Sequence, residues 1–376
     1  MMRLFIQASD VWLFRDGKPF DAASDHRARS LFPPYPSTMQ GAIRSKQLAL
    51  SNIDLDEYAN HHENAKSIAE AIGWPGGGYG RLKIHGPFIA QKKGDDLVRY
   101  FPMPSDVVKV EKDGKVKDSI MSPLKDSPFL NNAPEAVNPL WLRTEGRIEE
   151  AGGWLSEDEL GKYLIGNPFT TAPTEELFNR ESRFGIKLDK NKRQVEDGHL
   201  YEVEYIRPTD DMGLVVDVDG LESWPTSGFL SIGGEARAAL YEIVEPSENK
   251  ASMPNPGKDG KTRFKLYFAT PAYFKDGWRP HGGKWSRFFS KDVRLVSAVF
   301  NRMQMIGGAK VDRKSQESGI FQKAMRRYLP AGSVYFFEAD GRISYNGIPV
   351  TESSEGEGDL GQIGFGQIFI GRWKYV

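Results

Sequence analysis

Few side chains in this sequence could perform acid–base catalysis. The most enzyme-like pair is Asp25-His26, which is followed by Arg27 and Arg29. Neighbours in sequence rarely form an acid–base dyad, and the chain contains neither a Ser/His/Asp order nor an HExxH motif. We therefore expect a protein that is not an enzyme.

The residue types that bind metals and nucleotide cofactors are also scarce. The chain has no Cys and only six His, which excludes thiolate sites and leaves little material for a histidine cluster. It has no GxxxxGK[ST] loop, and the glycine run at 76–80 lacks the strand-to-helix setting of a dinucleotide fingerprint. We expect no metal and no cofactor.

Basic residues are numerous, but they are separated from the acidic ones. The 376 residues carry 50 Lys and Arg against 51 Asp and Glu, for a net charge of −1, yet residues 273–330 hold 13 basic residues and only four acids. Trp278, Trp285, Phe288 and Phe289 are interleaved with these cations. Such a segment can hold phosphates while the rings stack on bases, or it can be a solvated face with ordinary core aromatics. Acids collect instead at 352–359.

Two further basic clusters and three glycine pairs could contribute to a polyanion site. One cluster contains Arg180, Arg183, Lys187, Lys190, Lys192 and Arg193, and the other contains His26, Arg27, Arg29, Arg44 and Lys46. The glycine pairs are Gly233 and Gly234, Gly307 and Gly308, and Gly364 and Gly366. They are either turns that need positive φ or places where the backbone approaches RNA closely. Segregated charge of this kind is typical of a polyanion binder of near-neutral pI.

The elements that must position these side chains alternate between strands and helices. We predict a strand at 3–14, a helix at 38–50 capped by Ser37, and a second helix at 56–72 that ends at Gly73. Residues 94–178 are rich in proline and read as a long irregular insertion, with a capped helix at 156–166. Two strands around a charged tip predict a hairpin at 183–207.

The chain is predicted to form two domains, at 1–250 and 251–376. The segments 14–19 and 274–280 share a Phe-basic-Asp-Gly pattern, and 246–261 has linker composition. We predict α+β folds with antiparallel sheets, of which the ferredoxin-like βαββαβ arrangement fits best and a doubly wound sheet is the alternative. No apolar run suits a signal peptide or a membrane span, so we expect a cytoplasmic protein without a membrane partner.

Several segments together resemble one family. They are DVWLFRDGKPFDAASDHRARSLFPPYPSTMQGAIRS, FPMPSD, RFGIKLDKNKRQVEDGHLYEVEYIR, LSIGGEARAAL, TPAYFKDGW and LPAGSVYFFE. In this order they resemble the third subunit of type III-B (Cmr) CRISPR effector complexes, a member of the RAMP superfamily. The resemblance implies two RRM-like ferredoxin domains, a thumb hairpin at 183–205, and glycine-rich loops at 364–366 and 233–234. The segment IGFG at 363–366 departs from the family in having no basic residue within the loop.

The resemblance also implies a function and partners. The subunit would hold the 5′ tag of the crRNA, contact the large polymerase-like subunit and adjoin the RAMP backbone subunits, without cutting RNA. Phosphate contacts are expected from Arg27, Arg29, Arg44, Arg183, Lys187, Lys190, Arg237, Lys310, Arg326 and Arg327, with His26 stacking on or hydrogen-bonding to a base. Two alternatives stay open: a RAMP-type crRNA-processing endoribonuclease that uses His26, and a scaffold whose basic face meets acidic protein.

Overall fold

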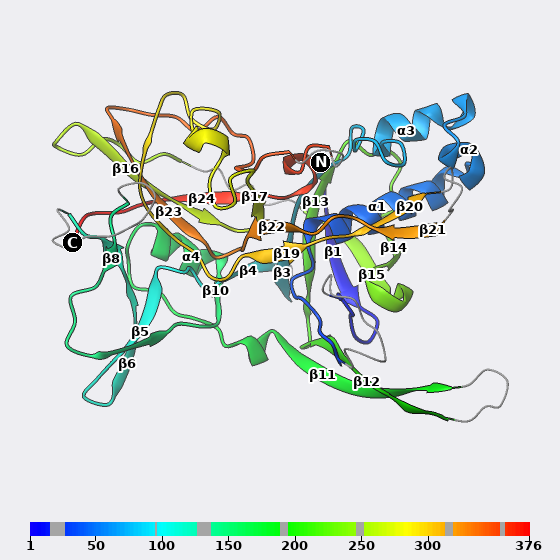
Figure 1. The fold of residues 1–376 in the computed structure, drawn as a ribbon, viewed down its shortest axis with the longest axis horizontal. Helices are drawn as coiled ribbons and strands as arrows, with labels where there is room; N and C mark the ends of the chain where they lie inside the picture. The colour runs from blue at the N-terminus through cyan, green and yellow to red at the C-terminus, as the bar shows by residue number, and fades with distance from the viewer. Residues whose placement is uncertain are drawn as a thin grey trace. The chain divides into compact units, whose positions relative to one another are not determined.

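The protein has a mixed α+β fold whose sheets are mostly antiparallel, as predicted (Figure 1). The computed structural model describes residues 1–15, 27–94, 96–125, 137–188, 195–245, 252–312, 319–353 and 358–376. These residues form two compact units, each built from three stretches of chain. The N-terminal unit comprises Met1–Val98, Thr174–Pro246 and Met305–Arg326, and the C-terminal unit comprises Arg99–Pro173, Ser247–Gln304 and Arg327–Val376.

The N-terminal unit is built on an antiparallel sheet. Within this unit the strand order is β3 (Lys83–Lys93), β13 (Met212–Asp219), β1 (Met2–Ala8), β15 (Ala238–Val244) and β14 (Ser227–Ser231). Leu4, Phe5 and Ile6 are successive residues of β1 and are all buried, so this central strand is covered on both faces. The sheet therefore provides a fixed base for the loops at its ends.

The helices of this unit follow β1 in sequence and differ in part from the prediction. Helix α1 spans Pro36–Ser51 with Tyr35 as its N-cap and no side-chain cap, so the predicted capping by Ser37 is wrong: Pro36 already occupies the first turn. Met39 and Ile43 are buried, as the apolar spacing predicts. The second predicted helix is broken into three pieces, α2 (Leu55–Ala59), η1 (Glu63–Ala65) and α3 (Lys66–Ile72), because His61 adopts a φ of 60° between them.

The predicted hairpin is present and is longer than expected. Strands β11 (Phe178–Leu188) and β12 (Val195–Pro208) pair antiparallel along their length, and the short strand β2 (Arg27–Ala28) pairs parallel with β12 (Figure 1). The predicted first strand at 3–14 ends early, at Ala8, and Trp12 instead exchanges backbone hydrogen bonds with Ile206 of the hairpin. The chain after β1 therefore runs along the hairpin base.

The C-terminal unit has its own antiparallel sheet. Its strand order is β18 (Arg294–Val299), β23 (Val334–Asp340), β16 (Lys261–Phe268) and β24 (Ile368–Arg372). A core of mostly aromatic side chains packs on it, and its fully buried members include Phe264, Phe274 and Phe337. The short strand β17 (Ala272–Tyr273) pairs with β22 (Arg326–Leu329). After β19 (Gln304–Ile306), the pair β20 (Ala309–Asp312) and β21 (Gly319–Gln322) belongs to the third stretch of the N-terminal unit.

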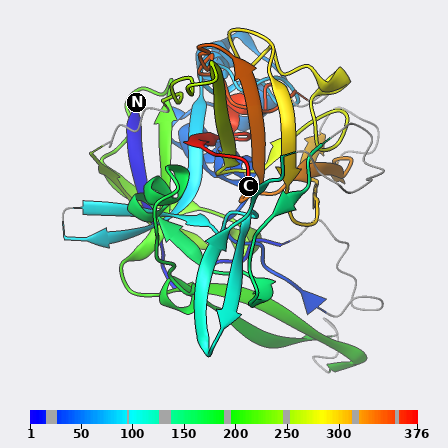
Figure 2. The ribbon, with the colours of Figure 1, turned by 90° about the vertical axis from the view of Figure 1, so that its left-hand side faces the viewer.

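The region predicted as an irregular insertion includes seven strands among its described residues. It contains β4 (Asp96–Pro102), β5 (Val107–Lys112), β6 (Lys115–Ile120), β7 (Ser122–Pro123), β8 (Leu140–Trp141), β9 (Arg147–Glu150) and β10 (Trp154–Ser156). Strands β6, β5 and β9 form one small sheet (Figures 1 and 2). The predicted capped helix is confirmed as α4 (Glu157–Leu164), whose N-cap Ser156 accepts a hydrogen bond from the Glu159 N–H. The prolines of this region led to the wrong prediction because most of those in the described residues lie between strands.

A buried charged cluster holds residues 99–173 to strand β16 within the C-terminal unit. The Lys265 ammonium lies 3.4 Å from a carboxylate oxygen of Asp106 and 3.4 Å from the centre of the Tyr163 ring. The Tyr163 hydroxyl donates to the other Asp106 oxygen at 2.6 Å, and all three side chains are almost fully buried. Burial lowers the pKa of Lys265 and, together with Asp106, raises that of Tyr163.

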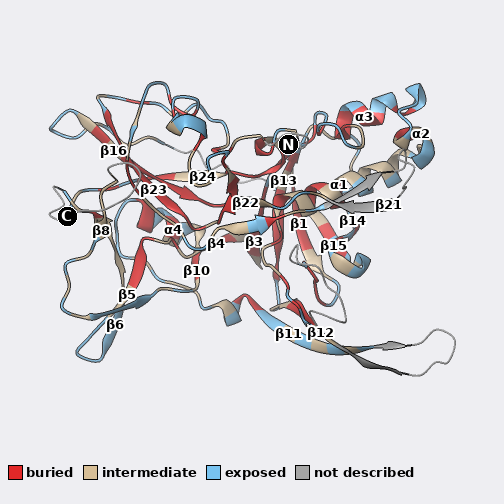
Figure 3. Ribbon diagram, viewed as in Figure 1, coloured by how far each residue is buried: buried red, intermediate tan, exposed pale blue. Residues whose placement is uncertain are grey.

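Burial differs sharply along the elements (Figure 3). The sheets carry most of the buried residues, whereas the tip of the β5–β6 hairpin, at 111–117, and the middle of β11 are exposed. On β11, Phe184 is 70% exposed and Ile186 is 46% exposed, although both are apolar. None of the helices in the described ranges is both long and apolar enough to cross a membrane.

Candidate nucleic-acid interface

A cavity of about 410 Å³ opens in the N-terminal unit at the start of α1. Three segments line it: the chain after β1, the first turns of α1 with the loop before it, and the loop after β14. The lining residues are Phe14, Arg15, Leu31, Pro34, Tyr35, Ser37, Thr38, Gly41, Ala42, Ser45, Ser231, Gly233 and Gly234. The volume suits a ligand the size of a nucleotide.

The glycine loop after β14 forms one wall of this cavity. Gly233 has a φ of +77°, and a Cβ atom there would lie 2.4 Å from the Leu13 carbonyl oxygen. That same oxygen accepts a hydrogen bond from the Gly234 N–H at 2.7 Å. Gly233 is therefore required by its φ and by the close approach of the Leu13 backbone, and the loop is held against the chain after β1.

The opposite wall supplies the polar groups that suit a phosphate. Ser37, Thr38 and Ser45 contribute hydroxyls. No side chain caps α1, Pro36 has no N–H, and the Thr38 N–H donates to the Tyr35 carbonyl at 2.9 Å. A helix N-terminus carries partial positive charge, which favours anions. Arg15 adds a full positive charge to the lining. Arg15 also forms an isolated β-bridge with Ser30, so the backbone of the exposed Arg29, the residue before Ser30, lies beside that of Arg15.

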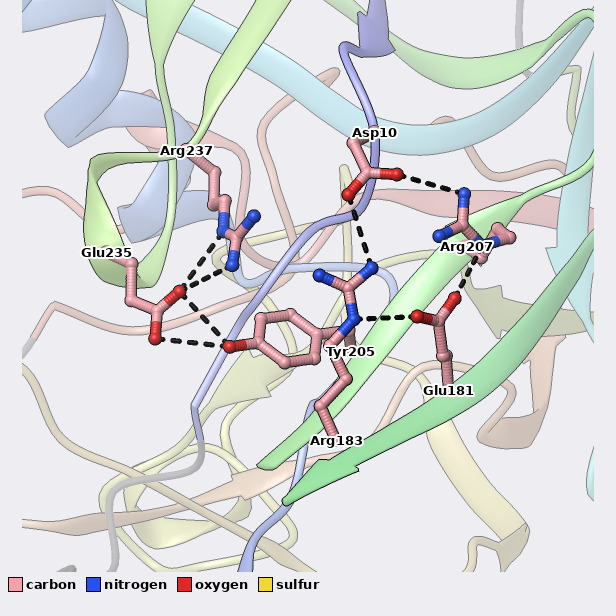
Figure 4. A network of polar contacts seen from close by, with 7 residues as sticks. All are labelled: Asp10, Glu181, Arg183, Tyr205, Arg207, Glu235 and Arg237. Carbon is pink, nitrogen blue, oxygen red and sulfur yellow. Dashed lines mark hydrogen bonds and ion pairs between the residues drawn. The ribbon is translucent and has the colours of Figure 1, made fainter. Parts of the chain in front are cut away.

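Two predicted RNA-binding residues meet on one tyrosine at the hairpin base (Figure 4). The Arg183 guanidinium lies 5.0 Å from the centre of the Tyr205 ring, and the Arg237 guanidinium lies 4.8 Å from it. The Tyr205 hydroxyl donates to Glu235, which belongs to the same loop as Gly234. The network thus links the hairpin to the wall of the cavity.

The arginines of this network are paired with carboxylates that the sequence analysis left out. Arg183 contacts Glu181 at 2.7 Å and Asp10 at 3.2 Å, and Arg207 contacts the same two acids at 2.5 and 3.0 Å. Arg237 contacts Glu235 at 2.6 Å. The arginine hydrogen bonds hold the pKa of both Asp10 and Glu181 below its usual range. All three arginines remain partly exposed, so a phosphate can still compete for them.

The other face of the hairpin base carries Arg27, whose guanidinium lies 3.3 Å from Glu202 and 3.9 Å from the more buried Glu204. Arg180 contacts the same Glu204 at 2.5 Å. Arg29, two residues after Arg27, is exposed, and within the described part of the chain it makes no ion pair. Of the predicted cations at this end of the hairpin, Arg29 is the least compensated by acids.

Three other predicted cations, Arg44, Arg326 and Arg327, lie outside this network. The Arg44 guanidinium donates to the Tyr58 hydroxyl and the Gly73 carbonyl, so it braces α1 against the turn after α3. Arg326 and the exposed Arg327 lie on β22. His26 and Lys190 fall outside the described residues, and for Lys187 on β11 and Lys310 on β20 only the backbone is described.

Two interpretations of the 273–376 region need correction. Trp285, Phe288 and Phe289 are buried in the core of the C-terminal unit, so they cannot stack on bases as the interleaved pattern suggested. Gly364 and Gly366 are also buried. The Gly366 N–H donates to Pro271, and a Cβ atom on Gly366 would lie 2.7 Å from the Val350 backbone. These two glycines therefore serve the fold. Gly307 and Gly308 approach the Met325 and Lys323 side chains.

The sequence analysis missed the cavity residues Arg15, Ser37 and Thr38 as ligand contacts, as well as the acids of the network. One signal for the acids was available. Alternation along a predicted hairpin places Glu181, Arg183, Tyr205 and Arg207 on one face, and this face is what the register of β11 and β12 produces. Asp10 and Glu235 reach it from distant segments, which alternation within the hairpin does not reveal.

Comparison with known proteins identifies the family. The family model described as CRISPR-associated protein (Cas_Cmr3) matches residues 4–373. The chain belongs to the Cas_Cmr3 family. This confirms the resemblance to the third subunit of type III-B (Cmr) CRISPR effector complexes. No curated protein matches the chain in sequence.

Chains of solved Cmr-beta complexes are similar to this chain at 15% identity. One comes from a cryo-EM structure of the Type III-B Cmr-beta bound to cognate target RNA and AMPPnP; the match covers 89% of this chain and 86% of that chain with a TM-score of 0.48. Another, from Cmr-beta bound to cognate target RNA, covers the same shares with a TM-score of 0.47.

Proposed function

We propose that this Cas_Cmr3 family member is a non-catalytic crRNA-binding subunit that holds the crRNA 5′ tag and contacts the large polymerase-like subunit. The observation that carries the RNA-binding part is the cavity at the start of α1. There an uncapped helix N-terminus, three hydroxyls, a glycine loop and Arg15 surround a nucleotide-sized space. The contact with the large subunit rests on family membership.

The neighbouring hairpin base extends this site. Because Glu235 bonds to Tyr205, the hairpin and the cavity wall form one connected surface within the N-terminal unit. An RNA strand whose phosphate enters the cavity would pass the guanidinium groups of Arg29, Arg183 and Arg237. The exposed Phe184, the next residue along β11, lies on the opposite face of the hairpin from Arg183, where it can stack on or wedge against a base.

The strand orders support the proposal that both units are ferredoxin-like. Numbered along the chain, the central strands β15, β1, β13 and β3 of the N-terminal unit follow the order 4-1-3-2. Strands β24, β16, β23 and β18 of the C-terminal unit follow the same order, and all of these neighbours pair antiparallel. A βαββαβ unit has this order. The described residues between β16 and β18 form β17, turns and η4 (His281–Gly283) where that arrangement has a helix.

RNA binding by the full chain tests the proposal. Wild type should bind RNA that carries the repeat-derived 5′ tag more tightly than RNA with a scrambled tag. Arg29→Gln should weaken tagged-RNA binding about threefold to tenfold and reduce the salt slope by about 0.7, as expected for one lost phosphate contact. Arg81→Gln is the control, because Arg81 is 59% exposed in the same unit but belongs neither to the hairpin base nor to the chain segments that line the cavity. Equal behaviour of the two variants would contradict the assignment.

A cleavage assay tests the non-catalytic part. Purified protein incubated with repeat RNA, with and without divalent metal, should leave the RNA intact. Cleavage that His26→Ala abolishes would establish the endoribonuclease alternative instead.

A further inference from the structure

A second cavity, of about 430 Å³, lies within the C-terminal unit and is lined almost entirely by charged side chains. Its cations are Lys125, Lys261, Arg263 and Arg294, and its carboxylates are Asp259 and Glu338. The lining therefore has an excess of two positive charges. Neither the cavity at α1 nor the hairpin base contributes to it.

The floor of this cavity is a cross-strand row on the sheet of the C-terminal unit. Glu338 on β23 is buried and sits between Arg263 on β16 and Arg294 on β18, its register partners on the two neighbouring strands. Its oxygens lie 2.9 Å from each of these guanidinium groups and 3.1 Å from the Lys261 ammonium. One carboxylate thus fixes three cations, which remain partly exposed toward the cavity.

Both carboxylates keep their charge near neutral pH. Burial by itself would raise the pKa of Glu338, but the hydrogen bonds from Arg294 and Lys261 outweigh it and leave the pKa below its usual range. The hydrogen bond from Arg263 lowers the pKa of Asp259 in the same way. The lining therefore keeps its excess of positive charge near neutral pH, because the two carboxylates offset only two of its four cations.

Lys125 and Tyr375 complete the opening. Lys125 is exposed and, within the described ranges, has no ion pair. The Tyr375 hydroxyl accepts a hydrogen bond from Arg294 at 3.0 Å, and the Tyr375 ring lies 5.3 Å below the Arg263 guanidinium. An aromatic ring and an ammonium that has no ion pair among the described residues thus flank the row of cations.

We propose that this cavity binds the phosphate group of a nucleotide. Arg294 and Lys125 would contact the phosphate, while Glu338 holds Arg263 and Lys261 in place beneath it. A dianionic phosphate matches the excess of two charges and accepts the forked hydrogen bonds of a guanidinium, whereas a single carboxylate would leave one charge unbalanced. The volume exceeds that of a bare phosphate and leaves room for a sugar or base beside Tyr375.

Calorimetric titration of the full chain tests the site, with pyrophosphate and adenosine monophosphate as probes at low salt. Wild type should bind both saturably, and more weakly as salt rises. Lys125→Gln should lower the affinity about threefold to fivefold, the range expected for one partly exposed charge pair. Lys284→Gln, which removes an exposed lysine of the same unit outside the cavity, should leave it unchanged.

A second variant makes the test independent of simple charge loss. Glu338→Gln keeps the side-chain shape but removes the competing carboxylate, so the affinity for pyrophosphate should rise about threefold or more if the variant retains the wild-type melting temperature. Absence of saturable binding of pyrophosphate, adenosine monophosphate and an RNA oligonucleotide alike in wild type, or equal loss in Lys125→Gln and Lys284→Gln, would overturn the proposal.

Two further binding measurements distinguish an RNA chain from a free nucleotide as the source of the phosphate. If an RNA oligonucleotide loses affinity in Lys125→Gln but mononucleotides do not bind, the phosphate comes from an RNA chain, whereas binding of mononucleotides alone identifies a free nucleotide. Tighter binding of a polyglutamate peptide than of either probe would overturn the phosphate assignment. Because the Arg29 test concerns the other unit, either result can fail without the other.

Discussion

Arginine and lysine meet carboxylates in both units, but at very different depths. In the C-terminal unit, Lys265, Asp106 and Tyr163 are almost fully buried and contact one another. At the hairpin base of the N-terminal unit, Arg183 and Arg207 share Asp10 and Glu181 where all four side chains are a third to a half exposed. The same residue types therefore serve two purposes: the buried cluster resists the loss of any partner, whereas the exposed network can exchange its partners for those of a ligand.

The physical reason is the surrounding medium. A charge removed from water depends on its partner, and breaking a buried pair leaves an uncompensated charge. An exposed pair gains little from its contact, because water and salt replace most of what either partner loses. Stability should thus respond strongly to changes at Asp106, and RNA binding should respond to changes at Arg183.

The largest expected effect comes from a variant that disrupts the buried charged cluster. Asp106→Ala removes the only carboxylate that contacts Lys265 within the described residues and leaves the Tyr163 hydroxyl without its acceptor. We expect a loss of about 3–5 kcal/mol in the free energy of unfolding, measured by chemical denaturation. The double variant Asp106→Leu with Lys265→Met should recover most of this loss, because it removes both charges; a single variant that loses less than about 1 kcal/mol would contradict the role of the pair.

A second variant tests whether the N-terminal unit requires a glycine at position 233. Gly233→Ala forces a positive φ on alanine and brings its Cβ against the Leu13 carbonyl oxygen. The expected loss of unfolding free energy is about 3 kcal/mol, with weaker binding of tagged RNA because the cavity wall moves. Gly94→Ala is the control: Gly94 also has a positive φ but has open space around it, so about 1 kcal/mol is expected.

The exposed side of the comparison is tested by a pair of arginines. Arg183 and Arg207 contact the same two acids, but only Arg183 lies over the Tyr205 ring. Arg183→Gln should weaken RNA binding about threefold or more while changing the unfolding free energy by less than about 1 kcal/mol. Arg207→Gln should produce a similar stability change with a smaller effect on RNA. A larger RNA effect from Arg207→Gln would reverse this assignment.

The smallest expected effect is a pH dependence of the exposed network. The folded protein holds the pKa of Asp10 and Glu181 below the usual values, so the stabilisation is fully present above the unfolded-state pKa. It is lost as the pH falls through the lowered folded-state pKa. Melting temperatures between pH 6 and pH 3 should fall slightly less steeply for the double variant Asp10→Asn with Glu181→Gln than for wild type. Identical slopes would show that the network contributes nothing measurable.

The sequence predicts the local elements of this fold better than their assembly. The hairpin, the antiparallel α+β class and the cap at Ser156 follow from alternation, turn residues and capping chemistry, all of which act over a few residues. The Ser37 cap fails because Pro36 starts the helix two positions earlier than predicted. The helix at 56–72 fails because periodicity does not reveal the positive φ of His61.

The candidate site was predictable only in part, because its contacts are long-range. Arg183 and Arg237 could be singled out as cations, but their meeting on Tyr205 and their pairing with Asp10 and Glu235 depend on tertiary packing. Composition likewise could not separate the buried Trp285 and Phe288 from exposed rings. Residues 94–178 show the same limit, since proline marks the turns between strands as readily as an irregular region.

The division of the chain between the two units has a consequence for synthesis. Each unit combines three stretches of sequence, and the N-terminal unit takes its last one from Met305–Arg326, beyond most of the C-terminal unit. A chain growing on the ribosome therefore cannot finish its first unit before it has produced two of the three stretches of its second. Cutting the gene near residue 250 would deprive one product of Met305–Arg326 and the other of Arg99–Pro173, so neither half contains a complete folding unit.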